Sequence, residues 1–383
     1  MERDIYDEDH EAFRDVVKEF VKRYVTNQKR EQWDADRDTM LAAGASGIIG
    51  LSVPEEFGGA GMLQDYRFRA VVNEEVIAAG AGSLAGAFGI QDDLAVPYLV
   101  HMGTQAQKEK WLPRMATGEI LGALAMSEPG AGSDLRGIKT TAKKVDGGYL
   151  VNGAKTFISS GKTADIVVTF VKTGEGNRPD AFSILIIENG MEGFDHGKKL
   201  HKMGFHGHDT AELSFSDVFV PEENLIGGKE GLGFSQLMMT LPLERLSIGV
   251  AAAAAGEAAF HWTRDYVISR EAFGERIADF QNTRFRLADM ATTVDVMWAY
   301  VDRAMELYAE QKLTAEEAAK VKFWATDREA ELLDIGVQLH GGYGYITEYP
   351  IARAFLDARV HRIYGGTNEI MRDIVSRQIA GKR

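Results

Sequence analysis

The chain of 383 residues contains no cysteine. That absence excludes disulfide bonds, a thiolate nucleophile, iron–sulfur clusters and cysteine-ligated zinc. Any chemistry must therefore come from oxygen and nitrogen groups or from a bound cofactor. The sequence also lacks G-x-G-x-x-G after a strand, the P-loop, H-E-x-x-H and G-x-S-x-G. A Rossmann enzyme, a P-loop enzyme, a zincin and an α/β-hydrolase are accordingly disfavoured.

Basic residues are fewer than acidic ones, with 43 Lys and Arg against 57 Asp and Glu and a formal net charge of −14. This balance excludes nucleic-acid binding through a general basic field. The longest apolar stretch, Ile248 to Ala259, is rich in alanine and interrupted by Gly256 and Glu257, so no membrane span is predicted. The acidic N-terminus resembles neither a secretory signal nor a transit peptide. We expect a cytoplasmic (bacterial) protein, or one of an organelle matrix after removal of a transit peptide.

Hydrophobic patterning changes twice along the chain and predicts three domains. In residues 1–120 apolar side chains such as Phe13, Val17 and Phe20 recur with helical spacing. Residues 121–226 contain short β-branched and aromatic runs between turn residues, which predicts a small antiparallel β domain. Helical spacing returns in long pieces over residues 227–383 and predicts a helix bundle. The fold class is therefore mainly α with a central β domain.

Three glycine-rich segments interrupt this pattern. The first is A-M-S-E-P-G-A-G-S-D at 125–134, and the second is R-E-A-F-G at 270–274, with Gln281 eleven residues after Arg270. The third comprises Q-L-H-G-G-Y-G-Y at 338–345 and I-Y-G-G-T-N-E-I at 363–370. Glycine inside a helix costs roughly 1 kcal/mol relative to alanine, so the two glycine-rich breaks of the third segment favour close approach of a ligand to the backbone. Taken alone, the first and third segments are explained equally well as turns, and the second is better explained as a helix junction.

Histidine clusters once, at His201, His206 and His208. A metal site is one interpretation, but loop histidines without a clear carboxylate or cysteine set are a weak coordination pattern. Polar loop residues between strands are the favoured interpretation, and no metal is predicted.

Taken together and in this order, the segments resemble the acyl-CoA dehydrogenase family. The matching motifs are those above, F-S-D-V-F-V-P at 215–221, and the extension of the third segment to E-Y-P at 348–350. The resemblance implies an N-terminal helical domain, a middle antiparallel β-barrel and a C-terminal four-helix bundle. It also implies a flavoprotein that binds FAD, oxidises an acyl-CoA thioester to the trans-2-enoyl-CoA and passes electrons to an electron-transfer flavoprotein. A homotetramer, as a dimer of dimers, is expected.

The same resemblance assigns cofactor contacts residue by residue. Ser127 would lie beside the flavin ring, Ser133 near the pyrophosphate, and Phe157 where many relatives have tryptophan. Arg270 would pair with the pyrophosphate, and a neighbouring subunit would reach FAD through Gln281, Gln338, Gly341 and Gly342. The implied FAD-binding residues are Met126, Ser127, Gly132, Ser133, Phe157, Ser159, Arg270, Phe273, Gln281, Gln338, Leu339, Gly341, Gly342, Thr367 and Glu369.

The expected catalytic residues are Glu244 and Gly365. The reaction needs a carboxylate to remove the α-proton, and many family members carry it in a terminal Tyr-Glu-Gly-Thr motif, whose glutamate position is Gly365 here. Glu244 resembles the base of the long-chain and isovaleryl-CoA branches, and the Tyr-Gly-Gly-Thr ending looks most like the long-chain branch. Two converging carboxylates would raise each other's pKa, so a base at Glu244 favours a small residue at 365.

The implied substrate-binding residues are Ser133, Ser235, Pro242, Arg245, Tyr364, Gly365 and Gly366. Ser235 stands where some relatives carry a bulkier residue, and the sequence does not fix the length or branching of the acyl chain. An acyl-CoA oxidase, whose reduced flavin reacts with oxygen, is one alternative. A non-catalytic flavin-binding paralogue subunit is another, although an intact Glu244 argues against it. A flavin monooxygenase would not need this base.

Overall fold

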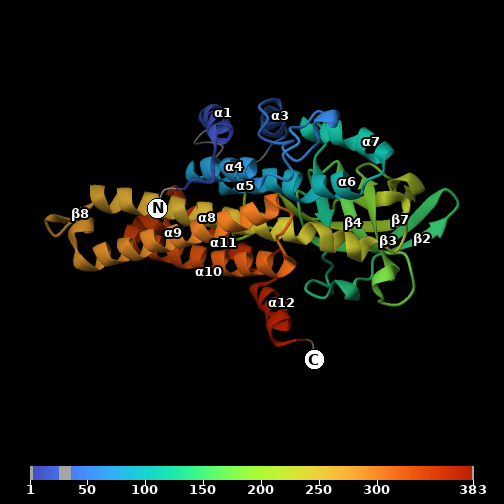
Figure 1. Cartoon of the computed structure of the whole chain (residues 1–383). Helices are drawn as coiled ribbons and strands as arrows, with labels where there is room; N and C mark the ends of the chain where they lie inside the picture. Colours follow the sequence, from blue (N-terminus) through green and yellow to red (C-terminus); the bar gives the residue numbers. More distant parts are fainter. Residues whose placement is uncertain (1–2, 26–35, 382–383) are drawn as a thin grey trace.

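The computed structural model describes residues 3–25 and 36–381. Within these ranges the chain forms helices, then a central sheet, then long helices (Figure 1). The mainly helical fold with a central β region, predicted from the sequence, is thereby confirmed. The N-terminal helices are α1 (Glu8–Tyr24), α3 (Arg37–Ala45), α4 (Tyr66–Ala78), α5 (Gly82–Gly89), α6 (Val96–Met102) and α7 (Gln105–Ala116).

Local sequence explains where several of these helices begin. Asp7 caps α1 and Thr104 caps α7, each in a reciprocal capping box with the residue three positions later. Val17 and Phe20 of α1 are buried, as the apolar spacing predicts. Between α5 and α6 the helix widens to a π-turn at Ile90–Ala95, which carries the buried Gln91.

The central sheet follows the order β1-β4-β2-β3-β7-β6, and β5 pairs with β4. Its strands are β1 (Gly122–Ala125), β2 (Thr141–Val145), β3 (Gly148–Ser159), β4 (Ile166–Lys172), β5 (Phe182–Glu188), β6 (Phe194–Asp195) and β7 (Thr210–Pro221). The prediction of an antiparallel sheet is wrong in part, because β4 runs parallel to both β1 and β2. The hairpin of β2 and β3 separates β1 from β4 in sequence, and this long connection lets β4 return in the same direction as β1.

The C-terminal region is built on three long helices that lie side by side (Figure 1). They are α8 (Gly233–Ser269), α9 (Gln281–Ala309) and α10 (Ala315–His340), with α11 (Pro350–Ala358) and α12 (Asn368–Ala380) packed on α10. Small residues let α8 and α10 approach closely, since a Cβ at Gly249 would lie 2.6 Å from Val321 Cγ1. By length and composition alone α8 could cross a membrane, but 67% of its most apolar window is buried in the fold, as in a core helix.

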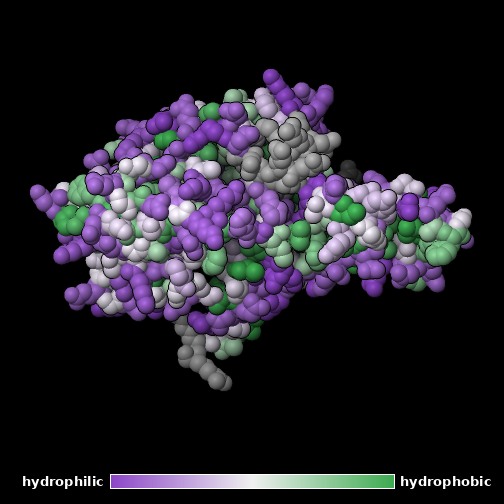
Figure 2. Space-filling view, turned by 180° about the vertical axis from the view of Figure 1, so that it is seen from behind, coloured by the Kyte–Doolittle hydropathy of each residue, from purple (hydrophilic) through white to green (hydrophobic). Residues whose placement is uncertain are grey.

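One end of these helices extends beyond the rest of the molecule as a narrow arm. Its tip carries the short hairpin of β8 (Glu271–Ala272) and β9 (Glu275–Arg276), at the opposite end of the molecule from β2 and β3 (Figure 1). Figure 2, seen from behind, shows the same extension, with apolar atoms among the polar ones. This separation determines which predicted site residues can meet within one chain.

Candidate active site

The loop after β1 and the end of β3 lie next to each other. The Thr156 N–H donates to the carbonyl oxygen of Ser127 at 3.0 Å, and the Lys155 ammonium donates to that of Met126 at 2.9 Å. The first two groups of predicted cofactor residues, in 126–133 and 157–159, are therefore adjacent although they are far apart in sequence.

A buried ion pair, which sequence reasoning missed, holds this loop. Lys155 is fully buried, and its Nζ lies 3.0 Å from Glu128 Oε1. The Glu128 carboxylate also accepts the backbone N–H groups of Lys139 at 2.6 Å and Thr140 at 3.0 Å. Burial opposes ionisation of Glu128, but Lys155 and these donors lower its pKa overall, whereas burial lowers the pKa of Lys155 to about 8. The sequence offered no clear signal for this pair, since β3 also carries Asn152, Thr156 and Ser159.

Phe157 presents an aromatic ring to the outside at this place. Its φ is 60° and its side chain is 71% exposed, where the pairing of β3 with β7 shifts between Lys155 and Ile158. A left-handed backbone is unusual for a bulky residue, and an exposed ring has no packing to offset the strain. Nearby, a Cβ added to Gly130 or Gly132 would meet no atom within 4 Å. The bulge and the open loop form a surface that suits a planar ligand with a polar tail.

Glu244 lies inside the protein on α8, with only 4% of its surface exposed. The Tyr98 hydroxyl, from α6, donates to Glu244 Oε1 at 3.2 Å. Burial raises the pKa of Glu244 to about 7, although hydrogen bonds from Thr240 and Tyr98 and the charge of Arg245 favour the ionised form. A carboxyl that titrates near neutral pH can act as a proton acceptor.

Gly365 lies against the helix that carries Glu244. A Cβ at Gly365 would lie 2.5 Å from Ile248 Cδ1, and Ile248 follows Glu244 by one helical turn. Gly365 and Gly366 both have left-handed backbones, with φ of 63° and 88°. The nearest obstacle to a side chain at 365 is thus Ile248 rather than Glu244, and the backbone of this turn is open to approach.

The other predicted substrate residues do not all lie near Glu244 and Gly365. Arg245 is buried beside Glu244, its Nε has no hydrogen-bond partner in the described part of the chain, and burial lowers its pKa. Tyr364 stacks on His361 with ring centres 5.5 Å apart, and Pro242 lies within α8. Ser235 is exposed near the start of α8, and its hydroxyl donates to the Leu232 carbonyl oxygen at 2.7 Å.

The remaining predicted cofactor residues do not join this site within one chain. Arg270 and Phe273 lie at the tip of the arm, where Phe273 is 98% exposed and the Arg270 guanidinium lies 5.9 Å from the Tyr343 ring centre. Gln281 is the first residue of α9, and Gln338 and Leu339 lie in the last turn of α10. A Cβ added at Gly341 or Gly342 would meet no atom within 4 Å. These residues gather at the arm and at the turn that follows α10, away from the β2–β3 end of the sheet (Figure 1). Thr367 and Glu369 lie at the start of α12, where the Thr367 hydroxyl accepts the Ile370 N–H at 3.3 Å.

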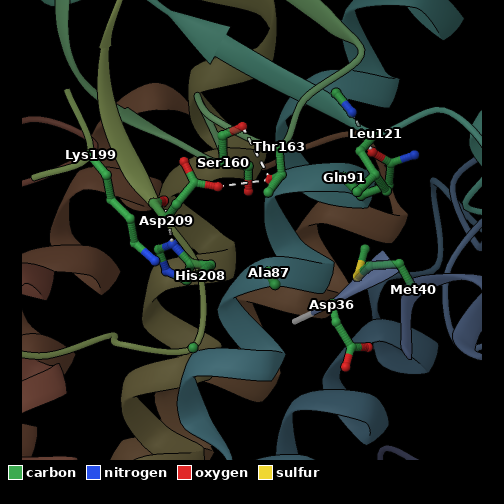
Figure 3. Close-up of a pocket in the computed structure, with 12 residues that line it drawn as sticks. Asp36, Met40, Ala87, Gln91, Leu121, Ser160, Thr163, Lys199, His208 and Asp209 are labelled. Atoms are coloured by element: carbon green, nitrogen blue, oxygen red, sulfur yellow. Dashed lines mark hydrogen bonds between the residues drawn. The ribbon is translucent and has the colours of Figure 1, made fainter. Parts of the chain in front are cut away.

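A separate cavity of about 300 Å³ lies between α3, α5 and the sheet (Figure 3). Its polar walls are already satisfied by the protein. The Gln91 amide donates to the Met115 and Ile120 carbonyls at 2.9 Å each, and Asp209 accepts the Thr163 hydroxyl at 2.8 Å. Glu244 does not line it, so this cavity is distinct from the site around the carboxylate.

The histidine cluster does not form a metal centre in the described part of the chain. No group of three or more His, Asp or Glu residues in residues 3–25 and 36–381 is arranged to hold a metal ion. His208 Nδ1 lies 3.1 Å from the Asp209 carbonyl oxygen, and burial together with Lys202 lowers the His208 pKa to about 3. These residues serve as polar loop residues.

The structure combines a helical, sheet and helical succession with a buried carboxylate, Glu244, on the helix that contacts Gly365 through Ile248. Three family descriptions match in order: acyl-CoA dehydrogenase, N-terminal domain, at residues 7–119, the middle domain at 123–218 and the C-terminal domain at 231–380. The chain belongs to the acyl-CoA dehydrogenase family. This confirms the resemblance found in the sequence.

Named relatives agree with this membership. The long-chain specific acyl-CoA dehydrogenase of Rattus norvegicus mitochondria is 41% identical over 383 residues, 98% of this chain and 88% of that protein. The mitochondrial isovaleryl-CoA dehydrogenase of Arabidopsis thaliana is 36% identical over 98% of this chain and 92% of that protein. An acyl-CoA dehydrogenase structure from Geobacillus kaustophilus has a TM-score of 0.93 at 40% identity and covers 98% of both chains.

FAD is the cofactor of this family. An acyl-CoA dehydrogenase from Bacillus anthracis was solved in complex with FAD, and it matches with a TM-score of 0.90 at 31% identity over 98% of this chain and 67% of that one. The residues of this chain fit the group: the exposed Phe157 ring offers a stacking surface, and Gly130 and Gly132 leave open space where a side chain would otherwise stand.

Proposed function

We propose that this enzyme oxidises an acyl-CoA thioester to the trans-2-enoyl-CoA, in fatty acid β-oxidation or related acyl-CoA catabolism. One observation carries the proposal: a buried glutamate whose pKa is raised to about 7 lies on the helix face that meets the glycine turn at 365. The named relatives, which include long-chain and isovaleryl-CoA dehydrogenases, support an acyl-CoA substrate.

Glu244 acts as the base that removes the α-proton. The protein desolvates the carboxylate, and this raises its proton affinity and so its strength as a base. The Tyr98 hydrogen bond holds the Oε1 atom of the carboxylate in place. Bound FAD supplies the acceptor for the hydride that leaves the β carbon.

The turn at 364–366 binds the thioester. Gly365 has no side chain, so its N–H can approach the thioester carbonyl and stabilise the negative charge that develops as the α-proton leaves. One such donor typically contributes ~3 kcal/mol to the transition state. Tyr364 and Gly366 flank Gly365 in this turn, and Arg245 follows Glu244 on α8.

FAD binding is proposed to need two chains. Met126, Ser127, Gly132, Ser133, Phe157 and Ser159 form one surface, whereas Arg270, Phe273, Gln281, Gln338, Leu339, Gly341 and Gly342 lie at the tip of the arm or near it. Because no hydrogen bond or ring contact joins the two groups within the described part of one chain, a second copy is proposed to bring its arm to the first surface. Thr367 and Glu369, at the start of α12, complete the proposed set. This arrangement needs at least two copies, and the homotetramer, as a dimer of dimers, is proposed on the family resemblance.

An electron-transfer flavoprotein is proposed as the electron acceptor. The alternative, an oxidase, would pass its electrons to oxygen. Stopped-flow mixing of the substrate-reduced enzyme with air separates the two, because a dehydrogenase with bound product should reoxidise slowly. Rapid reoxidation with release of hydrogen peroxide would favour the oxidase.

The proposed function is tested by mixing the purified FAD-loaded protein, without oxygen, with straight, branched and aromatic acyl-CoA substrates. At least one should bleach the flavin absorbance and give the 2-enoyl-CoA, and the pattern of rates would identify the acyl chain. The Glu244→Gln variant should keep its FAD and fail to bleach. No bleaching by any acyl-CoA in the native protein would contradict the proposal.

A further inference from the structure

Lys322, on α10, is a lysine with no exposed surface. Its ammonium donates to the carbonyl oxygen of Gly366 at 2.8 Å and to Asn368 Oδ1 at 2.9 Å. Both acceptors are uncharged. Burial lowers the pKa of Lys322 to about 7, and the Arg245 charge acts in the same direction. Burying a lysine costs free energy unless its ammonium makes hydrogen bonds. The two bonds of Lys322 offset that cost.

The second acceptor is itself fixed. The Asn368 amide nitrogen donates to Thr326 Oγ1 at 2.9 Å, Asp327 Oδ1 at 3.0 Å and the Phe323 carbonyl at 3.2 Å. With its nitrogen engaged by α10, Asn368 can turn only its oxygen toward Lys322. These bonds join the start of α12 to α10, and they fix the Asn368 oxygen that orients the Lys322 ammonium next to the glycine turn.

The turn at 364–366 has little rigidity of its own. Gly365 and Gly366 are consecutive glycines with φ of 63° and 88°, and glycine has the widest conformational freedom of any residue. The backbone is fixed on one side by the bond from the Tyr364 N–H to the Val360 carbonyl at 3.1 Å. The Lys322 bond to Gly366 fixes it on the other side. Gly365 therefore lies between two anchors, one of which is a side chain.

We propose that Lys322 is a positioning residue, which binds the Gly366 carbonyl and so keeps the Gly365 N–H directed at the thioester carbonyl of the substrate. This inference rests on the proposed function, because that function gives the Gly365 N–H its role. Lys322 touches neither substrate nor cofactor in this account. It acts through the turn.

The test compares Lys322→Met with Lys320→Met. Methionine fills the buried space without donating a hydrogen bond, and Lys320 is a partly exposed position on the same helix whose ion pair is with Glu316. Removal of an oxyanion donor lowers kcat by roughly 100- to 1,000-fold, and a misplaced donor costs part of that, so Lys322→Met should lose about 10- to 100-fold and Lys320→Met less than about twofold.

The decisive readout is a pair of CoA ligands with equal chain length. One is the enoyl-CoA product, which has the thioester carbonyl, and the other is an S-alkyl-CoA thioether, which lacks it. Lys322→Met should weaken binding of the enoyl-CoA about tenfold and change the Kd of the thioether less than about twofold. A role in folding alone would weaken both ligands equally, and that result overturns the inference, as does an unchanged kcat.

Lys322→Gln provides a second variant if Lys322→Met fails to fold or to hold FAD. The glutamine side chain is one bond shorter than that of lysine, so its amide should bind the Gly366 carbonyl only weakly while the site stays polar. We expect Lys322→Gln, like Lys322→Met, to weaken binding of the enoyl-CoA more than binding of the thioether. Bleaching of the native protein by acyl-CoA tests the proposed function separately. If the native protein turns over and both Lys322 variants match it, only the inference about Lys322 fails.

Discussion

The burial of Glu244, which would make it a stronger base in the proposed reaction, should destabilise the folded protein at neutral pH. The pKa of Glu244 is about 7 in the folded protein against 4.5 for an ordinary glutamate. Below pH 4.5 the carboxyl is protonated in both states, so it costs nothing. Between pH 4.5 and 7 the unfolded chain releases this proton and the folded one keeps it, so stability falls as pH rises, and above pH 7 the full cost remains.

The magnitude follows from the difference between the two pKa values. About 2.5 units correspond to ~3 kcal/mol, which is the most that Glu244→Gln can restore at pH 8. For a chain of 383 residues the entropy of unfolding makes this roughly a 4 °C rise in Tm. At pH 4.5 the rise should vanish, because glutamine and protonated glutamic acid have similar shape and no charge.

Differential scanning calorimetry at pH 4.5 and pH 8, with FAD content matched, measures this difference. Asp265→Asn, an exposed position on the same helix, is the control and should change Tm little at either pH. A Glu244→Gln variant with the native Tm at pH 8 would refute the reasoning. So would an equal rise at both pH values, because that would be a packing effect rather than a charge effect.

Two further predictions concern the same site, and a third concerns the proposed FAD contact at Arg270. Tyr98→Phe removes the 3.2 Å bond that favours ionised Glu244, so the acid limb of kcat should move to higher pH by about one unit, and an unchanged pH profile would contradict this. Gly365→Glu should rescue Glu244→Gln poorly, because its Cβ would lie 2.5 Å from Ile248 Cδ1, and adding Ile248→Ala should raise kcat by about tenfold or more. Full rescue without that addition would show that sterics do not limit the exchange. Arg270→Gln should lower the FAD retained through gel filtration while leaving the circular dichroism spectrum native, and full retention would remove Arg270 from the cofactor site.

Much of this architecture was accessible from sequence because it is locally encoded. Helical spacing, capping residues and β-branched runs each report on a few neighbouring positions, and they predicted the helical, sheet and helical order. The family motifs carried the FAD assignment, which the comparisons confirm. The roles of Glu244 and Gly365 remain predictions that the geometry supports.

What the sequence could not supply are contacts between distant segments. The parallel pairing of β4 with β1 depends on the route of the chain through the β2–β3 hairpin. The order and spacing of strands in the sequence do not predict which strands pair or in which direction. The Tyr98 bond to Glu244 spans 146 positions, and the Lys155 bond to Glu128 joins a strand to a loop. Phe157 shows the same limit, since the bulge that exposes its ring arises from pairing with β7.

The central claim is that Glu244 removes the α-proton, and proton exchange tests it without requiring oxidation. An acyl-CoA with sulfur in place of the β carbon cannot lose hydride, but its α-hydrogens can exchange with deuterium in heavy water on the enzyme. Mass spectrometry should show rapid exchange with the native protein and none above background with FAD-loaded Glu244→Gln. Exchange by that variant at the native rate would contradict the account.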